Sequence, residues 1–190
     1  MAEVIVALDV ASGEAVELLL DRLPAARWVK LGSVLMTREG PALVRALAAR
    51  GLQVFLDLKW HDIPNTVAGA VAAARELGVS MATVHLVGGA AMLRAAAAER
   101  GPGLGLVGVT VLTSHDASSY ARVMGREAVE IEAEVARLAA TAIPSGLQGV
   151  VCSPHEAAAV RTIIGPEAWL IVPGIRGRDD TPGDQSRVAS

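Results

Sequence analysis

The stretch FLDLKWHDIPNT, residues 55–66, decides how the rest of the sequence is interpreted. It begins as an apolar strand and then places four ionisable residues within six positions. Side chains of a strand alternate between its two faces, so Phe55, Asp57 and Lys59 share one face while two leucines share the other. A strand with this pattern predicts a sheet covered by helices, with a polar site at the strand's carboxyl end.

Apolar runs followed by helical patterns recur along the whole chain. The seven predicted strands lie at 4–10, 28–32, 52–59, 80–87, 104–113, 149–153 and 169–175. Helices are expected between them, for example an apolar stripe over 16–23 behind an N-cap at Ser12, and a helix from Pro41 that ends at Gly51. Ser153 and Glu156 predict a capping box at the start of another helix.

Seven βα steps predict the α/β class and a parallel sheet. We expect a TIM (β/α)8 barrel in which residues 1–190 form a single domain and the sequence ends before the eighth strand, because such barrels typically take about 250 residues. A doubly wound open sheet is the alternative. Neither G-x-G-x-x-G nor a P-loop follows the first strand, which removes the usual support for that alternative.

Composition restricts the classes of partner. The sequence is 52% hydrophobic and 19% charged, with a net charge of −3, which does not favour nucleic acid or a membrane surface. Aromatic residues make up 3%, too few for base-stacking platforms. The single Cys152 excludes an internal disulfide framework and is expected to be a small buried hydrophobe in a cytoplasmic protein. The N-terminus has no signal-peptide pattern, and no run is apolar enough to span a membrane.

Charged residues gather at the predicted strand ends, where barrel active sites lie. They are Asp9, Lys30, Asp57, Lys59 and Asp62. Unpaired buried charges are costly, so the cations and anions are expected to alternate. A lysine held between carboxylates keeps its proton and becomes a positioned proton donor. The alternative is that Asp57 and Lys59 form a structural ion pair at a strand end.

Several motifs occur together in one order across the 190 residues. They are ALD at 7–9, Lys30 followed by LG, FLDLKWHDIPNT, TVH at 83–85, VTVLTS at 109–114, GVVCS at 149–153, PGIR at 173–176 and GDQ at 183–185. In these motifs the sequence resembles the orotidine 5'-phosphate decarboxylase family, bacterial type. The D-x-K-x-x-D pattern alone is shared with sister phosphate-sugar barrels, whereas its continuation through I-P-N-T, together with PGIR and GDQ, is highly specific.

The resemblance implies loss of CO2 from orotidine 5'-phosphate to give UMP, in pyrimidine biosynthesis, without a cofactor or a metal. Lys59 would protonate C6 of the pyrimidine, and Asp57 would lie beside the substrate carboxylate. Lys30 and Asp57 would continue the charged catalytic array, and Asp62 would complete it from the second subunit of a homodimer. Thr66 would also reach across from that subunit. The remaining substrate-binding residues would be Asp9 and Lys30 at the ribose, Thr113 near the base, and Arg176 and Gln185 at the phosphate. The family completes its phosphate site with a Gly-Arg pair after strand eight, and the given sequence ends at Ser190, before the place of that motif.

Two other functions are consistent with parts of the pattern. A sister barrel acting on a sugar phosphate with Mg2+ would share D-x-K-x-x-D, but the I-P-N-T continuation speaks against it, and sensitivity to EDTA would distinguish it. A non-catalytic nucleotide-binding or interaction domain is the third alternative, against which the intact Asp57, Lys59 and Asp62 argue. The histidines and carboxylates lack metal-ligand spacing, so no metal site is expected.

Overall fold

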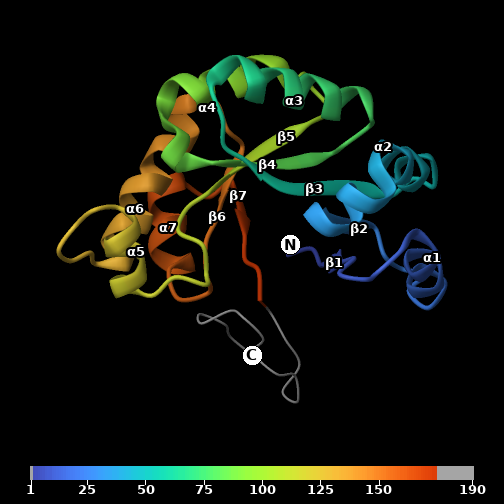
Figure 1. Ribbon diagram of the computed structural model, residues 1–190, viewed down its shortest axis with the longest axis horizontal. Helices are drawn as coiled ribbons and strands as arrows, with labels where there is room; N and C mark the ends of the chain where they lie inside the picture. Colours follow the sequence, from blue (N-terminus) through green and yellow to red (C-terminus); the bar gives the residue numbers. More distant parts are fainter. Residues whose placement is uncertain (1, 175–190) are drawn as a thin grey trace. The chain divides into compact units, whose positions relative to one another are not determined.

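Strands and helices alternate along the chain in the computed structural model, which describes residues 2–174 (Figure 1). The strands are β1 (Ile5–Ala7), β2 (Trp28–Gly32), β3 (Gln53–Trp60), β4 (Met81–His85), β5 (Gly105–Val109), β6 (Gly149–Val151) and β7 (Trp169–Ile171). The helices are α1 (Gly13–Asp21), α2 (Ser33–Ala49), α3 (Pro64–Glu76), α4 (Gly89–Glu99), α5 (Ala117–Val123), α6 (Ile131–Ala142) and α7 (Ala157–Ile164), with short 3-10 turns at Leu86–Gly88 and Ile143–Ser145.

The seven strands form one sheet in sequence order, β1 to β7. The pairs β1–β2, β2–β3, β5–β6 and β6–β7 are all parallel. In the register of the first three strands, Lys30 pairs with Ala7 on one side and Phe55 on the other, and Gly32 pairs with Asp57. The carboxyl ends of these strands therefore lie at the same edge of the sheet, as the prediction of a parallel βα repeat requires.

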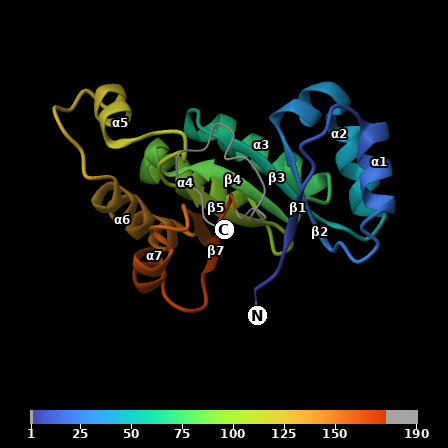
Figure 2. The same cartoon turned by 90° about the horizontal axis from the view of Figure 1, so that it is seen from below.

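The chain divides into two compact units. The first unit is the chain up to Thr83 together with Ala95–Leu106, and it holds β1, β2 and β3. In this unit α1 and α2 lie side by side next to β1 and β2 (Figure 2). Ser12 caps α1 as predicted, since its hydroxyl accepts the N–H of Ala15 at 3.2 Å. Buried leucines and valines of the three strands, such as Val29 and Leu56, form its core.

Two helical segments meet within α2. Gly40 has φ = +65°, which glycine adopts readily, and Pro41 follows as the first residue of the second segment. The predicted helix from Pro41 to Gly51 is therefore confirmed as this second segment. The first segment, from Ser33, was not predicted, and it carries two side chains that matter for the site described below.

The second unit consists of Val84–Arg94 and the chain from Val107 onward. Its helix α6 carries Glu134, a carboxylate with 4% of its side chain exposed. The carboxylate accepts hydrogen bonds from Arg137 at 2.7 and 3.0 Å, from Arg126 at 3.2 Å and from the hydroxyl of Tyr120 at 3.2 Å. The hydrogen bond from Arg137, with that from Arg126, lowers the pKa of Glu134 to about 2 despite its burial. This cluster joins α5 and the loop after it to α6.

Some predicted element boundaries were wrong. The predicted strand 104–113 ends at Val109, where pairing with β6 stops at Val151. The helix predicted to begin at Pro154 begins at Ala157, and only half of the expected capping box forms. Glu156 accepts hydrogen bonds from the N–H and the hydroxyl of Ser153, but the hydroxyl does not cap the helix. None of the described helices combines the length and apolarity needed to cross a membrane.

Candidate active site

A cavity of about 580 Å3 opens at the carboxyl ends of β1, β2 and β3, within the first unit. Four of the five predicted charged residues line it: Asp9, Lys30, Asp57 and Lys59. Gly32 and Arg38 also line the cavity, with an apolar wall that includes Leu8 and Leu35. The parallel register brings these side chains together, because each lies at or near the carboxyl end of one of three neighbouring strands.

Lys59 and Asp57 form an ion pair inside β3, with Lys59 Nζ 2.9 Å from Asp57 Oδ2. The carboxylate side chain is 14% exposed and the ammonium side chain 39% exposed. The carboxylate of Asp57 is therefore shielded from solvent, while the ammonium of Lys59 faces the cavity. A molecule bound in the cavity could receive a proton from this ammonium. The predicted orientation of both residues on one face of the strand is confirmed.

Lys30 and Asp9 form a second ion pair, with Lys30 Nζ 3.1 Å from Asp9 Oδ1. Exposure is reversed in this pair, because Lys30 is 24% exposed and Asp9 is 71% exposed. An exposed ion pair contributes little to stability. The predicted alternation of cations and anions thus holds for two neighbouring pairs in one cavity, in an arrangement suited to polar contacts with a ligand.

The entire sequence contains two lysines, and they are Lys30 and Lys59. Its other permanently basic side chains are all arginines. Both lysines line the same cavity. Lysine presents a compact ammonium that can release a proton, whereas an arginine guanidinium is effectively always charged. The placement of both lysines in this one cavity is what we expect of a site whose chemistry needs ammonium groups.

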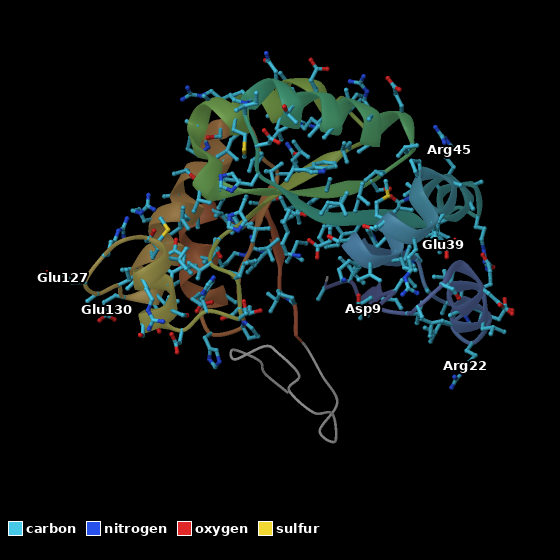
Figure 3. All side chains as sticks on the ribbon, in the orientation of Figure 1. Asp9, Arg22, Glu39, Arg45, Glu127 and Glu130 are labelled. Atoms are coloured by element: carbon cyan, nitrogen blue, oxygen red, sulfur yellow. The ribbon has the colours of Figure 1, made fainter. Side chains whose placement is uncertain are left out.

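Two adjacent side chains of the first segment of α2 hold the loop that follows Asp9. Arg38 Nη1 donates to the carbonyl of Ala11, and Glu39 Oε1 accepts the N–H of Gly13 at 2.8 Å. Figure 3 labels Asp9 on this loop and Glu39 on α2. These contacts fix the segment between β1 and α1, and hence the main chain next to Asp9.

Asp62 lies just before α3 and Thr66 lies in its first turn, and neither residue lines the cavity that holds the two ion pairs. Asp62 Oδ1 accepts the N–H of Ile63 at 2.6 Å, and the N–H of Thr66 donates to the carbonyl of Ile63 at 3.1 Å. Both side chains are exposed. Among the described residues, no ion pair joins Asp62 to Lys59. Their predicted contribution to a neighbouring subunit's site stays a prediction.

Thr113 belongs to the second unit, where it is half-buried in the segment after β5. Arg176 and Gln185, predicted to bind phosphate, lie outside the described residues. In residues 2–174 no group of three or more histidine, cysteine and acidic side chains could hold a metal ion.

Sequence reasoning missed Arg38 and Glu39, which come from the unpredicted first segment of α2, and it also missed Thr83 on β4. Its hydroxyl donates to Asp57 Oδ1 at 3.0 Å and accepts the N–H of Lys59 at 2.8 Å. The available signal was a hydroxyl between the apolar residues Ala82 and Val84 of the strand MATVH, one strand away from the charged pair.

Fold and site together define an α/β enzyme of the parallel βα type, with paired lysines and aspartates at the carboxyl ends of its strands. The model of the "Orotidine 5'-phosphate decarboxylase / HUMPS family" matches residues 2–190. The chain belongs to this family, as the sequence resemblance indicated.

Individual relatives agree with this assignment. The chain is 50% identical over 167 residues to an orotidine 5'-phosphate decarboxylase of Anaeromyxobacter sp. (strain K), covering 88% of this chain and 73% of the relative. It is 49% identical to the enzyme of that name from Halorhodospira halophila, covering 98% and 80%. The crystal structure of orotidine 5'-phosphate decarboxylase from Lactobacillus acidophilus superposes with a TM-score of 0.86 at 34% identity, covering 93% of this chain and 82% of that one. The likeness confirms the predicted fold class, a TIM-type βα repeat, with seven strands in the described residues.

Proposed function

We propose that this chain catalyses the decarboxylation of orotidine 5'-phosphate to UMP and CO2, without a cofactor or a metal, and that Lys59 supplies the proton. The observation that carries the proposal is the ammonium of Lys59, held 2.9 Å from Asp57 in a cavity that also holds the Lys30–Asp9 pair. Family membership supports the substrate, and the arrangement of the charges supports the mechanism.

The chemical step breaks the bond between C6 of the pyrimidine and its carboxyl carbon. CO2 leaves without the bonding electrons, which stay on C6 as a carbanion. The fixed ammonium of Lys59 stabilises the negative charge as it develops, and does so without reorganising because Asp57 already holds it. The ammonium then transfers a proton to C6, which gives UMP, and solvent reprotonates the neutral amine.

The other residues bind and orient the substrate. Asp57 lies beside the substrate carboxylate, where its negative charge disfavours the ground state relative to the transition state. Lys30 and Asp9 hold the ribose hydroxyls, which suits the exposure of Asp9. The protein acts as a cytoplasmic homodimer in which further contacts come from Asp62 and Thr66 of the second copy, from Thr113, and from Arg176 and Gln185 at the phosphate.

The test follows the absorbance change of orotidine 5'-phosphate with the purified chain. Lys59→Met keeps a long side chain but removes the ammonium, and we expect kcat to fall by at least about 10^4-fold. Arg45→Met is the matched control, because Arg45 is an exposed cation of α2 outside the cavity (Figure 3). Turnover in the wild type should persist in EDTA.

Three results would contradict the proposal. No turnover by the wild-type chain would remove the substrate assignment. Full turnover by Lys59→Met would remove the role of the ammonium. Loss of turnover in EDTA, restored by Mg2+, would remove the metal-free mechanism and favour a metal-assisted one, as expected for the sister barrels.

A further inference from the structure

Lys59 has an unusual backbone conformation. Its φ is +52°, and among the described residues it is the sole non-glycine residue with a positive φ. Residues with a Cβ avoid this region because the side chain approaches the following carbonyl. Lys59 lies inside β3, where the conformation also interrupts the regular pleat. Surrounding contacts must therefore hold the lysine in this conformation.

The hydroxyl of Thr83 makes that contact. The N–H of Lys59 donates to Thr83 Oγ1 at 2.8 Å. The same oxygen lies 3.0 Å from Asp57 Oδ1. An amide N–H can only donate and a carboxylate can only accept, so the hydroxyl must accept from Lys59 and donate its single proton to Asp57. Its direction is fixed by the two partners.

The three residues close a ring of hydrogen bonds. Asp57 Oδ2 accepts from Lys59 Nζ at 2.9 Å, while Asp57 Oδ1 accepts from Thr83. Lys59 is thus held at both its amide and its ammonium, and the two carboxylate oxygens have different partners. Thr83 is 1% exposed, so water cannot readily replace its hydroxyl.

We infer that Thr83 is a positioning residue for the decarboxylation, which sets the geometry of the Asp57–Lys59 pair without touching the substrate. The inference rests on the proposed function. Without the hydroxyl, the carboxylate of Asp57 loses the partner that fixes its rotation, and the Lys59 amide loses its acceptor. Since a small displacement of the ammonium weakens proton transfer more than it weakens substrate binding, the effect falls on kcat.

A second buried threonine provides the matched control. Thr110 is also 1% exposed, and its Oγ1 donates to the carbonyl of Val151 at 2.9 Å. Thr110→Val therefore removes an equally buried hydrogen-bonded hydroxyl from a segment next to a strand, with the same change in shape. Its effect measures what the substitution does through packing and general stability alone.

The kinetic test compares Thr83→Val, Thr83→Ser and Thr110→Val. We expect Thr83→Val to lower kcat by about 10- to 100-fold with KM within about threefold, and serine to restore kcat to within about fivefold of the wild type. Thr110→Val should stay within about threefold. In an Asp57→Ala background, Thr83→Val should lower the residual kcat by a clearly smaller factor than in the wild type, because one of the two partners of the hydroxyl is already absent and only the Lys59 N–H remains. Unchanged kcat in Thr83→Val, or an equal loss in both backgrounds, would overturn the inference.

A second measurement needs no turnover. Lysine-selective 15N labelling gives two backbone amide signals, from Lys30 and Lys59, because the sequence has two lysines. We expect amide hydrogen exchange at Lys59 to be at least about 10-fold faster in Thr83→Val than in the wild type, with Lys30 unchanged as the internal control. Equal exchange at Lys59 in both proteins would overturn the inference. If the wild type shows no turnover, the proposed function fails and this measurement still decides whether the hydroxyl holds the lysine.

Discussion

The carboxylate of Glu134 offers a stability prediction that can be worked out from the structure. Glu134→Gln keeps the size of the side chain but removes the charge that faces the guanidinium groups of Arg126 and Arg137. The hydrogen bond from Arg137, followed by that from Arg126, lowers the pKa of Glu134 from 4.5 to about 2. A shift of that size corresponds to about 3 kcal/mol of stabilisation by the charged form.

Solvent reduces this value. The side chains of Arg126 and Arg137 are 45% and 54% exposed, so water screens their charges and can solvate them when Glu134 is neutral. We therefore expect Glu134→Gln to lower the free energy of unfolding by about 2 kcal/mol at pH 7. For a chain of 190 residues, this corresponds to a decrease in Tm of about 4–8 °C.

The pH dependence has a definite sign. The pKa is lower in the folded state, so the stabilisation is fully present above pH 4.5 and is lost as the pH falls from 4.5 towards 2. The difference between wild type and Glu134→Gln should fall to less than half of its neutral value by about pH 3. Urea unfolding at pH 7, 5 and 3, followed by circular dichroism, measures this difference.

The control for this experiment is Glu132→Gln, on the same helix at an exposed position. It should change stability by less than about 0.5 kcal/mol at each pH. The reasoning is refuted if Glu134→Gln is as stable as the wild type at pH 7. It is also refuted if the difference between them is equally large at pH 7 and pH 3.

Two further substitutions test the packing and the capping. Gly149→Ala should lower the free energy of unfolding by more than about 3 kcal/mol, because the added Cβ would lie 2.0 Å from the carbonyl oxygen of Trp169 on β7, where the paired backbone cannot move aside. The control is Gly103→Ala, where an added Cβ would meet no atom within 4 Å. Thermal unfolding should give Tm values that differ by at least about 6 °C between the two variants, and equal values would contradict the contact. Ser12→Ala should lower the free energy of unfolding by about 1 kcal/mol because α1 loses its N-cap, whereas Ser12→Asp should keep the cap and the stability. Equal stability of the two variants in urea unfolding would show that the cap has no effect.

Much of the fold could be predicted because strand and helix periodicity is a local property of the sequence. The strand 28–32 was predicted with its observed bounds, and β3 was predicted to within one residue at each end. The errors have a common cause. The predicted strand 104–113 is mostly apolar up to its last residue, but its ladder ends at Val109 because its neighbour β6 is short. Pairing with another strand sets the end of a strand, and the sequence of one strand does not contain that information.

Helix α5 was missed for a different reason. It has seven residues, too few for a clear apolar stripe, and its capping box pairs Asp116 with Ser119 rather than with the glutamate or glutamine that usually signals a helix start. Its position depends on Tyr120, which reaches Glu134 on the following helix. Such a helix is stabilised by tertiary contacts more than by its own sequence.

The charged part of the site was predictable, but the way it is held was not. Strand alternation placed Asp57 and Lys59 on one face, and the parallel register brought Lys30 and Asp9 to the same cavity. The left-handed conformation of Lys59 has no sequence signal, since glycine or asparagine is the usual residue there. The role of Thr83 has no sequence signal either, because it rests on the contact between its hydroxyl and the N–H of Lys59 on the neighbouring strand.

The conformation of Lys59 also affects how this chain can change during evolution. Glycine would adopt a φ of +52° without steric conflict, which is worth on the order of 1 kcal/mol, but exchanging the lysine alone would leave the shielded carboxylate of Asp57 without its cation. A lineage released from selection for catalysis would therefore tend to lose the amine at position 59 together with the carboxylate at position 57, while keeping the barrel strands around them. The residue at position 59 is then a marker that separates working descendants of this chain from inactive ones.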